Sequence, residues 1–154
     1  GYWRLENGNL YGSGPGLCEL YTGDITWRDY TLEVTITPLI GAHHCANVRV
    51  QGAQRSYAAG LAPDGTLALY RKAGGVYEQV ASAPFAWRHG ERYTLRVAAR
   101  GDGLTVEAEG AGVRAALDWT DPAPYASGQI GLSTWHGSHT AYADLAVRPV
   151  EASE

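Results

Sequence analysis

The sequence predicts an all-β domain that folds as a two-sheet antiparallel sandwich, and three observations support this. Apolar and polar residues alternate with a period of two through many short segments. Pairs such as Asn7-Gly8, Asp64-Gly65 and Asp102-Gly103 separate these segments and suit tight hairpin turns. Helical periodicity is interrupted everywhere by Gly, Pro or β-branched residues. Many short strands, each with one polar face, are typical of a sandwich.

The strands follow in chain order from this alternation. We expect them at residues 2–6, 9–12, 17–21, 31–37, 46–51, 57–61, 66–72, 76–81, 93–100, 104–109, 113–119, 129–135 and 141–148. A short helical turn near residues 120–125 is the only helix that the pattern allows. The inward-facing phase of the strands predicts a core made of Leu32, Val34, Ile36, Val48, Val50, Leu95, Val97, Val106, Ile130, Leu132, Leu145 and Val147.

Composition narrows the class of protein. The 154 residues carry 12 basic and 16 acidic side chains, a net charge of −4 that argues against nucleic acid as a partner. No apolar run is long enough to cross a membrane, so we expect no membrane partner either. The chain has no Met, and we interpret residues 1–154 as one domain taken from a longer multidomain protein. Cys18 and Cys45 either form one disulfide or stay as two buried thiols.

Several stretches together resemble the concanavalin A-like, laminin-G-like jelly-roll domains. They are the hairpin at 3–10, the Trp-Arg-Asp-Tyr entry to a strand at 27–34, the paired strands at 48–51 and 57–61, the run that begins Gly-Gln-Ile-Gly-Leu at 128–135, and the strand with Asp144 at 143–147. The resemblance implies a jelly-roll sandwich of the kind appended to glycoside hydrolases and to bacterial ADP-ribosylglycohydrolase-like proteins, or found as a lectin. The excess of Arg over Lys suits a bacterial source, and the parent protein would decide between a cytoplasmic and a secreted location.

The segment at 46–51 is the first candidate for a ligand site. Asn47, Arg49 and Gln51 are predicted to share one strand face, opposite Val48 and Val50. Planar amide and guanidinium groups bind the paired donors and acceptors of sugar hydroxyls. The sequence therefore predicts a carbohydrate platform here, with an ordinary solvated sheet face as the alternative.

Aromatic residues supply the second part of the predicted site. Trp135 lies opposite the inward phase of its strand and is followed by His136, so its ring is placed to stack on a pyranose. Tyr57 is a further candidate contact, with Tyr21 and Tyr70 as additional rings. The alternative is that these aromatic side chains belong to the core.

Metal ligands are less well indicated. Neighbouring His43 and His44 point to opposite sides of an extended segment, so they cannot share a zinc ion. The jelly-roll resemblance implies a structural calcium site, for which Glu6, Asp24 and Asp144 are the candidate ligands.

Catalysis is the least favoured function. Glu107 and Glu109 have the two-residue spacing of a glycosidase carboxylate pair, but they occupy a strand face that is predicted to meet solvent. We therefore expect a non-catalytic carbohydrate-binding accessory module of a larger enzyme, with a glycan and the parent's catalytic domain as partners. The alternatives are a docking or dimerisation module without a ligand and, third, a glycoside hydrolase or lyase.

Overall fold

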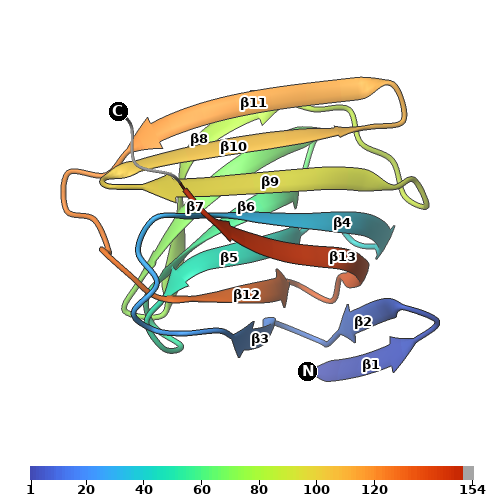
Figure 1. Cartoon of the computed structure of the whole chain (residues 1–154). Coiled ribbons are helices and arrows are strands. Elements are labelled where there is room, and N and C mark those ends of the chain that lie inside the picture. The colour runs from blue at the N-terminus through green and yellow to red at the C-terminus, as the bar shows by residue number, and fades with distance from the viewer. Residues whose placement is uncertain (151–154) are drawn as a thin grey trace.

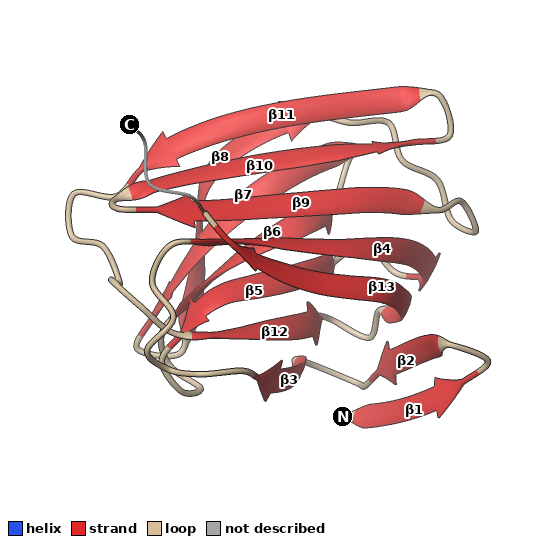
Figure 2. Ribbon diagram, in the orientation of Figure 1, coloured by secondary structure: helices blue, strands red, loops and turns tan. Residues whose placement is uncertain are grey.

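The computed structural model describes residues 1–150 and contains thirteen β-strands in this range (Figures 1 and 2). They are β1 (Tyr2–Glu6), β2 (Asn9–Ser13), β3 (Cys18–Thr22), β4 (Tyr30–Ile40), β5 (His44–Val50), β6 (Ser56–Ala62), β7 (Thr66–Ala73), β8 (Val76–Pro84), β9 (Tyr93–Arg100), β10 (Gly103–Gly110), β11 (Val113–Thr120), β12 (Gln129–Thr134) and β13 (His139–Pro149). Across the described residues there is no helix that is long and apolar enough to span a membrane. The helical turn expected near residues 120–125 is absent, and the chain there is irregular.

The strands form two antiparallel sheets that pack face to face (Figure 1). Sheet A has seven strands in the order β1-β2-β13-β4-β9-β10-β11, and sheet B has six in the order β3-β12-β5-β6-β7-β8. The two last strands insert among the first ones, because β13 pairs with β2 and β4 while β12 pairs with β3 and β5. This crossing between sheets gives the jelly-roll sandwich that the sequence predicts.

The core lies between the sheets and follows the predicted alternation. Of the expected core residues, all but Leu145 and Val147 are buried, and Val147 still packs against the core. The assignment of Leu145 is wrong, since its side chain is 43% exposed. A β-bulge between Ala143 and Ala146, with Asp144 at a φ of 54°, reverses the facing of the strand at this point.

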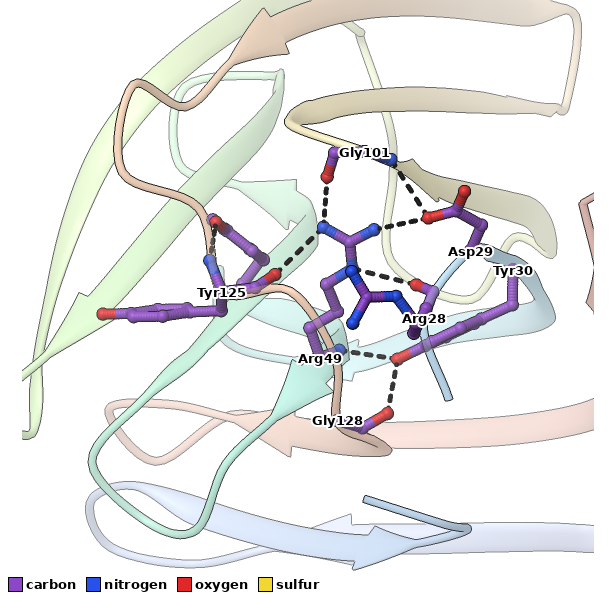
Figure 3. A network of polar contacts seen from close by, with 8 residues as sticks. Arg28, Asp29, Tyr30, Arg49, Gly101, Tyr125 and Gly128 are labelled. Atoms are coloured by element: carbon purple, nitrogen blue, oxygen red, sulfur yellow. Dashed lines mark hydrogen bonds and ion pairs between the residues drawn. The ribbon is translucent and has the colours of Figure 1, made fainter. Parts of the chain in front are cut away.

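A buried guanidinium ties the two sheets together at one end of the sandwich (Figure 3). Arg49 lies at the end of β5 with a φ of 49°, and its side chain is completely buried. The expectation that it shares an open face with Asn47 and Gln51 is therefore wrong. The left-handed backbone at Arg49 breaks the strict alternation of the strand and directs the side chain toward the neighbouring loops.

Each nitrogen of the Arg49 guanidinium donates a hydrogen bond. Its Nε donates to the carbonyl of Arg28 at 3.0 Å, and its Nη2 pairs with Asp29 Oδ1 at 3.0 Å. Its Nη1 donates to the carbonyls of Gly101 at 2.5 Å and Tyr125 at 2.9 Å. These contacts join β5 of sheet B to the β9–β10 turn of sheet A and to the irregular segment that precedes β12 (Figure 3). We call this set of contacts the Arg49 clamp.

Core packing supplies the first testable prediction. Ile36→Ala should lower the free energy of unfolding by about 2–5 kcal/mol, because it removes a fully buried side chain and leaves a cavity. Leu145→Ala, at the exposed bulge position, should change it by less than about 0.5 kcal/mol. Urea unfolding of both variants measures the difference, and equal losses would contradict the assignment of faces.

The Arg49 clamp supplies the second testable prediction. Arg49→Ala should lower the free energy of unfolding by about 3 kcal/mol or more, since three partly buried carbonyls lose their donor and the buried side chain leaves a cavity. Arg49→Lys should recover only part of this loss, because an ammonium cannot reproduce the planar fork. Arg148→Ala, at an exposed position of β13, is the matched control. An Arg49→Ala domain as stable as the control would show that the clamp contributes nothing.

Candidate functional site

The outer face of sheet B is concave. Glu19 on β3 and Lys72 on β7 are separated by β12, β5 and β6, and four strand spacings in a flat sheet amount to about 19 Å. The Lys72 Nζ nevertheless lies 2.6 Å from Glu19 Oε1. Two side chains cannot meet over that span on a flat surface, so the edges of sheet B curve toward each other. We call this outer surface the concave face.

A buried polar network spans the concave face. The Glu19 carboxylate accepts hydrogen bonds from Lys72 and from the Tyr77 hydroxyl. The Asn47 amide donates to the Tyr77 hydroxyl at 2.9 Å, and its oxygen accepts from Ser133 at 2.8 Å. Burial and the charge of Glu19 raise the pKa of Tyr77, so this phenol keeps its proton and donates it to the carboxylate. All members of the network therefore have defined donor and acceptor roles.

An aromatic cluster lies next to this network. The ring of Tyr77 stacks on Trp135 with centroids 4.2 Å apart and an interplanar angle of 25°. His43 stacks on Trp135 at 5.3 Å, and Tyr70 meets it edge-on at 4.6 Å. Trp135 is consequently only 5% exposed, yet its indole Nε1 has no hydrogen-bond partner among residues 1–150. A buried donor without a partner is unfavourable, and such groups mark positions where an acceptor can bind.

Small residues under the rings make room for this cluster. Cys45, Ala58, Ala62 and Ala68 are buried beneath Trp135 and Tyr70. Burial raises the pKa of the Cys45 thiol, so it stays protonated. Cys45 and Cys18 are both free thiols, which decides between the two alternatives left open by the sequence.

The structure brings some of the predicted ligand residues together on the concave face. Asn47 and Trp135 both lie there, and Trp135 faces away from the core phase as expected. His136 is exposed at the rim, with its ring 5.0 Å from that of His43. Burial and the proximity of His136 lower the pKa of His43, which favours a neutral imidazole against the indole of Trp135.

Other predicted ligand residues lie elsewhere. Arg49 belongs to the clamp described above, and Tyr57 is buried between the sheets, where its hydroxyl donates to Asp121 at 2.6 Å. Gln51 is half-buried and donates to the carbonyl of Ser127 at 2.9 Å. These three side chains support the loops at the clamp end of the sandwich rather than the concave face.

Sequence reasoning missed Glu19, Lys72 and Tyr77. Glu19 comes from one edge strand of sheet B and Tyr77 from the other, so no local pattern joins them. Lys72 gave one sequence signal of this network. It is the only Lys of the chain, and it lies two residues after Tyr70 on the same strand face. Its burial inside a strand requires a carboxylate partner, which the sequence alone does not identify.

The predicted calcium ligands are not brought together. Glu6 pairs with Arg4 at 3.2 Å on the exposed β1, and Asp144 is 78% exposed, with Arg92 3.8 Å away. Within residues 1–150 no group of three or more acidic, His or Cys side chains is placed to hold a metal ion. The two neighbouring histidines do face opposite ways, because the His44 ring bonds Thr140 at 2.6 Å instead of joining His43.

The candidate glycosidase pair lies on the other sheet. Glu107 and Glu109 are exposed on the outer face of sheet A, where they pair with Arg96 at 3.3 Å and with Arg114 at 2.8 Å. A general acid of a glycosidase instead needs a carboxyl group in a sheltered apolar setting. Glu107 and Glu109 therefore lack the sheltered setting of a glycosidase acid.

Comparison with known proteins identifies the architecture. Neither the models of protein families nor the curated proteins give a match. Among solved structures, the carbohydrate-binding module CBM66 from Bacillus subtilis superposes with a TM-score of 0.84 at 19% identity, covering 96% of this chain and 91% of that one. The lumenal domain of VIP36 with bound Ca²⁺ and Man3GlcNAc gives 0.75 at 11% identity, covering 99% and 83%. The galectin LEC-6 from Caenorhabditis elegans gives 0.57 at 14% identity, covering 93% and 99%. The chain therefore has the concanavalin A-like jelly-roll fold.

Proposed function

We propose that this domain is a non-catalytic carbohydrate-binding module that holds one sugar ring on the concave face, in the position now taken by the side chain of Tyr77. The observation that carries the proposal is the setting of that side chain. It places a six-membered ring 4.2 Å from the indole of Trp135 and a hydroxyl against Glu19 and Asn47. A pyranose offers the same combination of a flat apolar face and hydroxyl groups.

Removal of Tyr77 from this position would free a complete set of sugar contacts. Glu19 would regain an acceptor oxygen and Asn47 a donor, while Lys72 remains beside them as a charged donor. The Nε1 of Trp135, which has no partner in the described part of the chain, would meet an acceptor. Charge-assisted hydrogen bonds of this kind are the stronger ones and suit paired hydroxyl groups.

Tyr77 is placed so that it can leave. It lies on β8, an edge strand of sheet B, and follows the turn at Gly74 and Gly75. Its side chain is only half-buried, and the preceding Val76 is exposed. Rotation of one side chain toward solvent therefore opens the concave face without moving the core, and the closed form lowers affinity by the fraction of open molecules.

The structural neighbours support the same function. One is named a carbohydrate-binding module, VIP36 was solved with mannose and with Man3GlcNAc, and LEC-6 is a galectin. We further propose that the domain works as an accessory module of a larger bacterial enzyme, with the catalytic domain as its partner in the same chain. Weak binding to a repeated glycan, with a dissociation constant of about 10 µM to 1 mM, suits such a role.

The test begins with a glycan-array screen, and calorimetry then uses the strongest glycan found. Tyr77→Ala should bind that glycan about tenfold more tightly than the natural chain, because the open form no longer has to be selected. Trp135→Phe, which removes the indole N–H but keeps an aromatic ring, should bind at least about tenfold more weakly. Tyr2→Ala, at an exposed position of β1, is the matched control and should bind normally.

Circular dichroism of each variant shows whether the sandwich is intact. With folded variants, unchanged or weaker binding by Tyr77→Ala would overturn the exchange of Tyr77 for sugar. If no glycan binds to the natural chain or to Tyr77→Ala at millimolar concentration, the carbohydrate-binding function itself is rejected.

A further inference from the structure

A pocket lies at the clamp end of the sandwich, beside β4 and β13 of sheet A and away from the concave face of sheet B. Its volume is about 320 Å³, which falls in the range of small-ligand sites. It lies between the loop that leads into β4 and the last residues of β13, and its lining consists of Trp27, Arg28, Asp29, Tyr30, Val147 and Pro149. Apolar rings and side chains thus form most of the wall, with one cation and one carboxylate beside them.

The aromatic wall of this pocket is fixed in place. The Trp27 nitrogen donates to the carbonyl of Asp24 at 3.2 Å, and its own carbonyl accepts from Gly128 at 2.9 Å. Its indole packs on Gly23, where a Cβ atom would come within 2.6 Å of the ring. The side chain is still 38% exposed. An exposed indole on a rigid loop binds a flat ligand without an entropic cost for ordering itself.

The charges at the pocket do not cancel. Asp29 is neutralised from inside, because its Oδ1 pairs with Arg49 and also accepts from the backbone nitrogen of Gly101, each at 3.0 Å (Figure 3). Arg28 is exposed, and its guanidinium makes no hydrogen bond or ion pair with any residue in the described part of the chain. The Arg49 clamp uses only the Arg28 carbonyl. A free guanidinium therefore stands beside an apolar wall, with one oxygen of the neighbouring carboxylate already held by Arg49 and Gly101.

We infer that this pocket binds an acidic sugar, a hexuronate residue of a glycan, whose ring stacks on Trp27 and whose carboxylate pairs with Arg28. The indole provides the apolar platform that a pyranose needs. The guanidinium provides two parallel donors, the geometry that a carboxylate accepts. The inference does not depend on the concave face, since it uses no residue of that surface.

Two sugars that differ only in the carboxylate test the inference. The five Trp indoles are labelled with ¹⁵N and followed by nuclear magnetic resonance, with the Trp27 signal assigned from the spectrum of Trp27→Phe. Methyl β-D-glucuronide should shift the Trp27 indole signal with a dissociation constant in the millimolar range, and methyl β-D-glucoside should do so about tenfold more weakly.

Charge variants separate specific pairing from general attraction. Arg28→Gln should weaken glucuronide binding about tenfold and remove the preference over the glucoside. Arg88 is an exposed Arg near the opposite end of β4. Arg88→Gln should leave the glucuronide affinity and the preference over the glucoside unchanged. The inference is overturned if glucuronide does not move the Trp27 signal, if both sugars act equally, or if Arg28→Gln binds normally. Failure of the concave-face proposal would appear separately, in the signal of Trp135 and in the Tyr77→Ala variant.

Discussion

The buried guanidinium of Arg49 is the interaction on which the arrangement of the loops depends. A charge without water is tolerated only where hydrogen-bond partners surround it, and this one needs carbonyls from three distant segments. The loop before β4, the β9–β10 turn and the segment before β12 must therefore all lie around β5. The β9–β10 turn belongs to sheet A and β5 to sheet B, so the same contact fixes the two sheets at this end.

The clamp also has a consequence for the surface. Because Arg49 takes up Asp29 and the carbonyl of Arg28, the loop is rigid and the Arg28 side chain remains free to face solvent. Arg49 is thus a buried structural cation, and the Arg28 guanidinium next to it in the fold is an exposed one. The charged residues of the concave face differ from Arg28, because Glu19 and Lys72 form an ion pair with each other across the curved sheet. Buried ion pairs contribute little to stability when compared with apolar residues, which favours a role in binding for Glu19 and Lys72.

The fold could be predicted from the sequence because its signals are local. Leu32, Val34 and Ile36 alternate with polar residues within one strand, and all three are buried as this pattern indicates. Trp135 was placed opposite the core phase by the same argument. Leu145 and Arg49 were misplaced for one shared reason, a non-glycine residue with positive φ at or beside them. A bulge moves the following side chains to the opposite face of the strand, and the residue types in the sequence do not predict where a bulge occurs.

The candidate site was predicted only in part because it is not local. Asn47 and Trp135 could be proposed from strand phase and chemistry. The Tyr77 hydroxyl that Asn47 contacts also donates to Glu19. Tyr77 and Glu19 come from opposite edges of a six-stranded sheet, and they meet only because the sheet is curved. Strand order and curvature arise from the packing of the whole sandwich, so they could not be deduced from the alternation within single strands.

A crystal structure of the domain with an oligosaccharide bound tests the central claim most directly. The predicted result is a sugar ring stacked on Trp135, with the Nε1 of that residue donating to a sugar oxygen and the side chain of Tyr77 rotated out to solvent. Sugar bound only on the outer face of sheet A, with Tyr77 still stacked on Trp135, would contradict it.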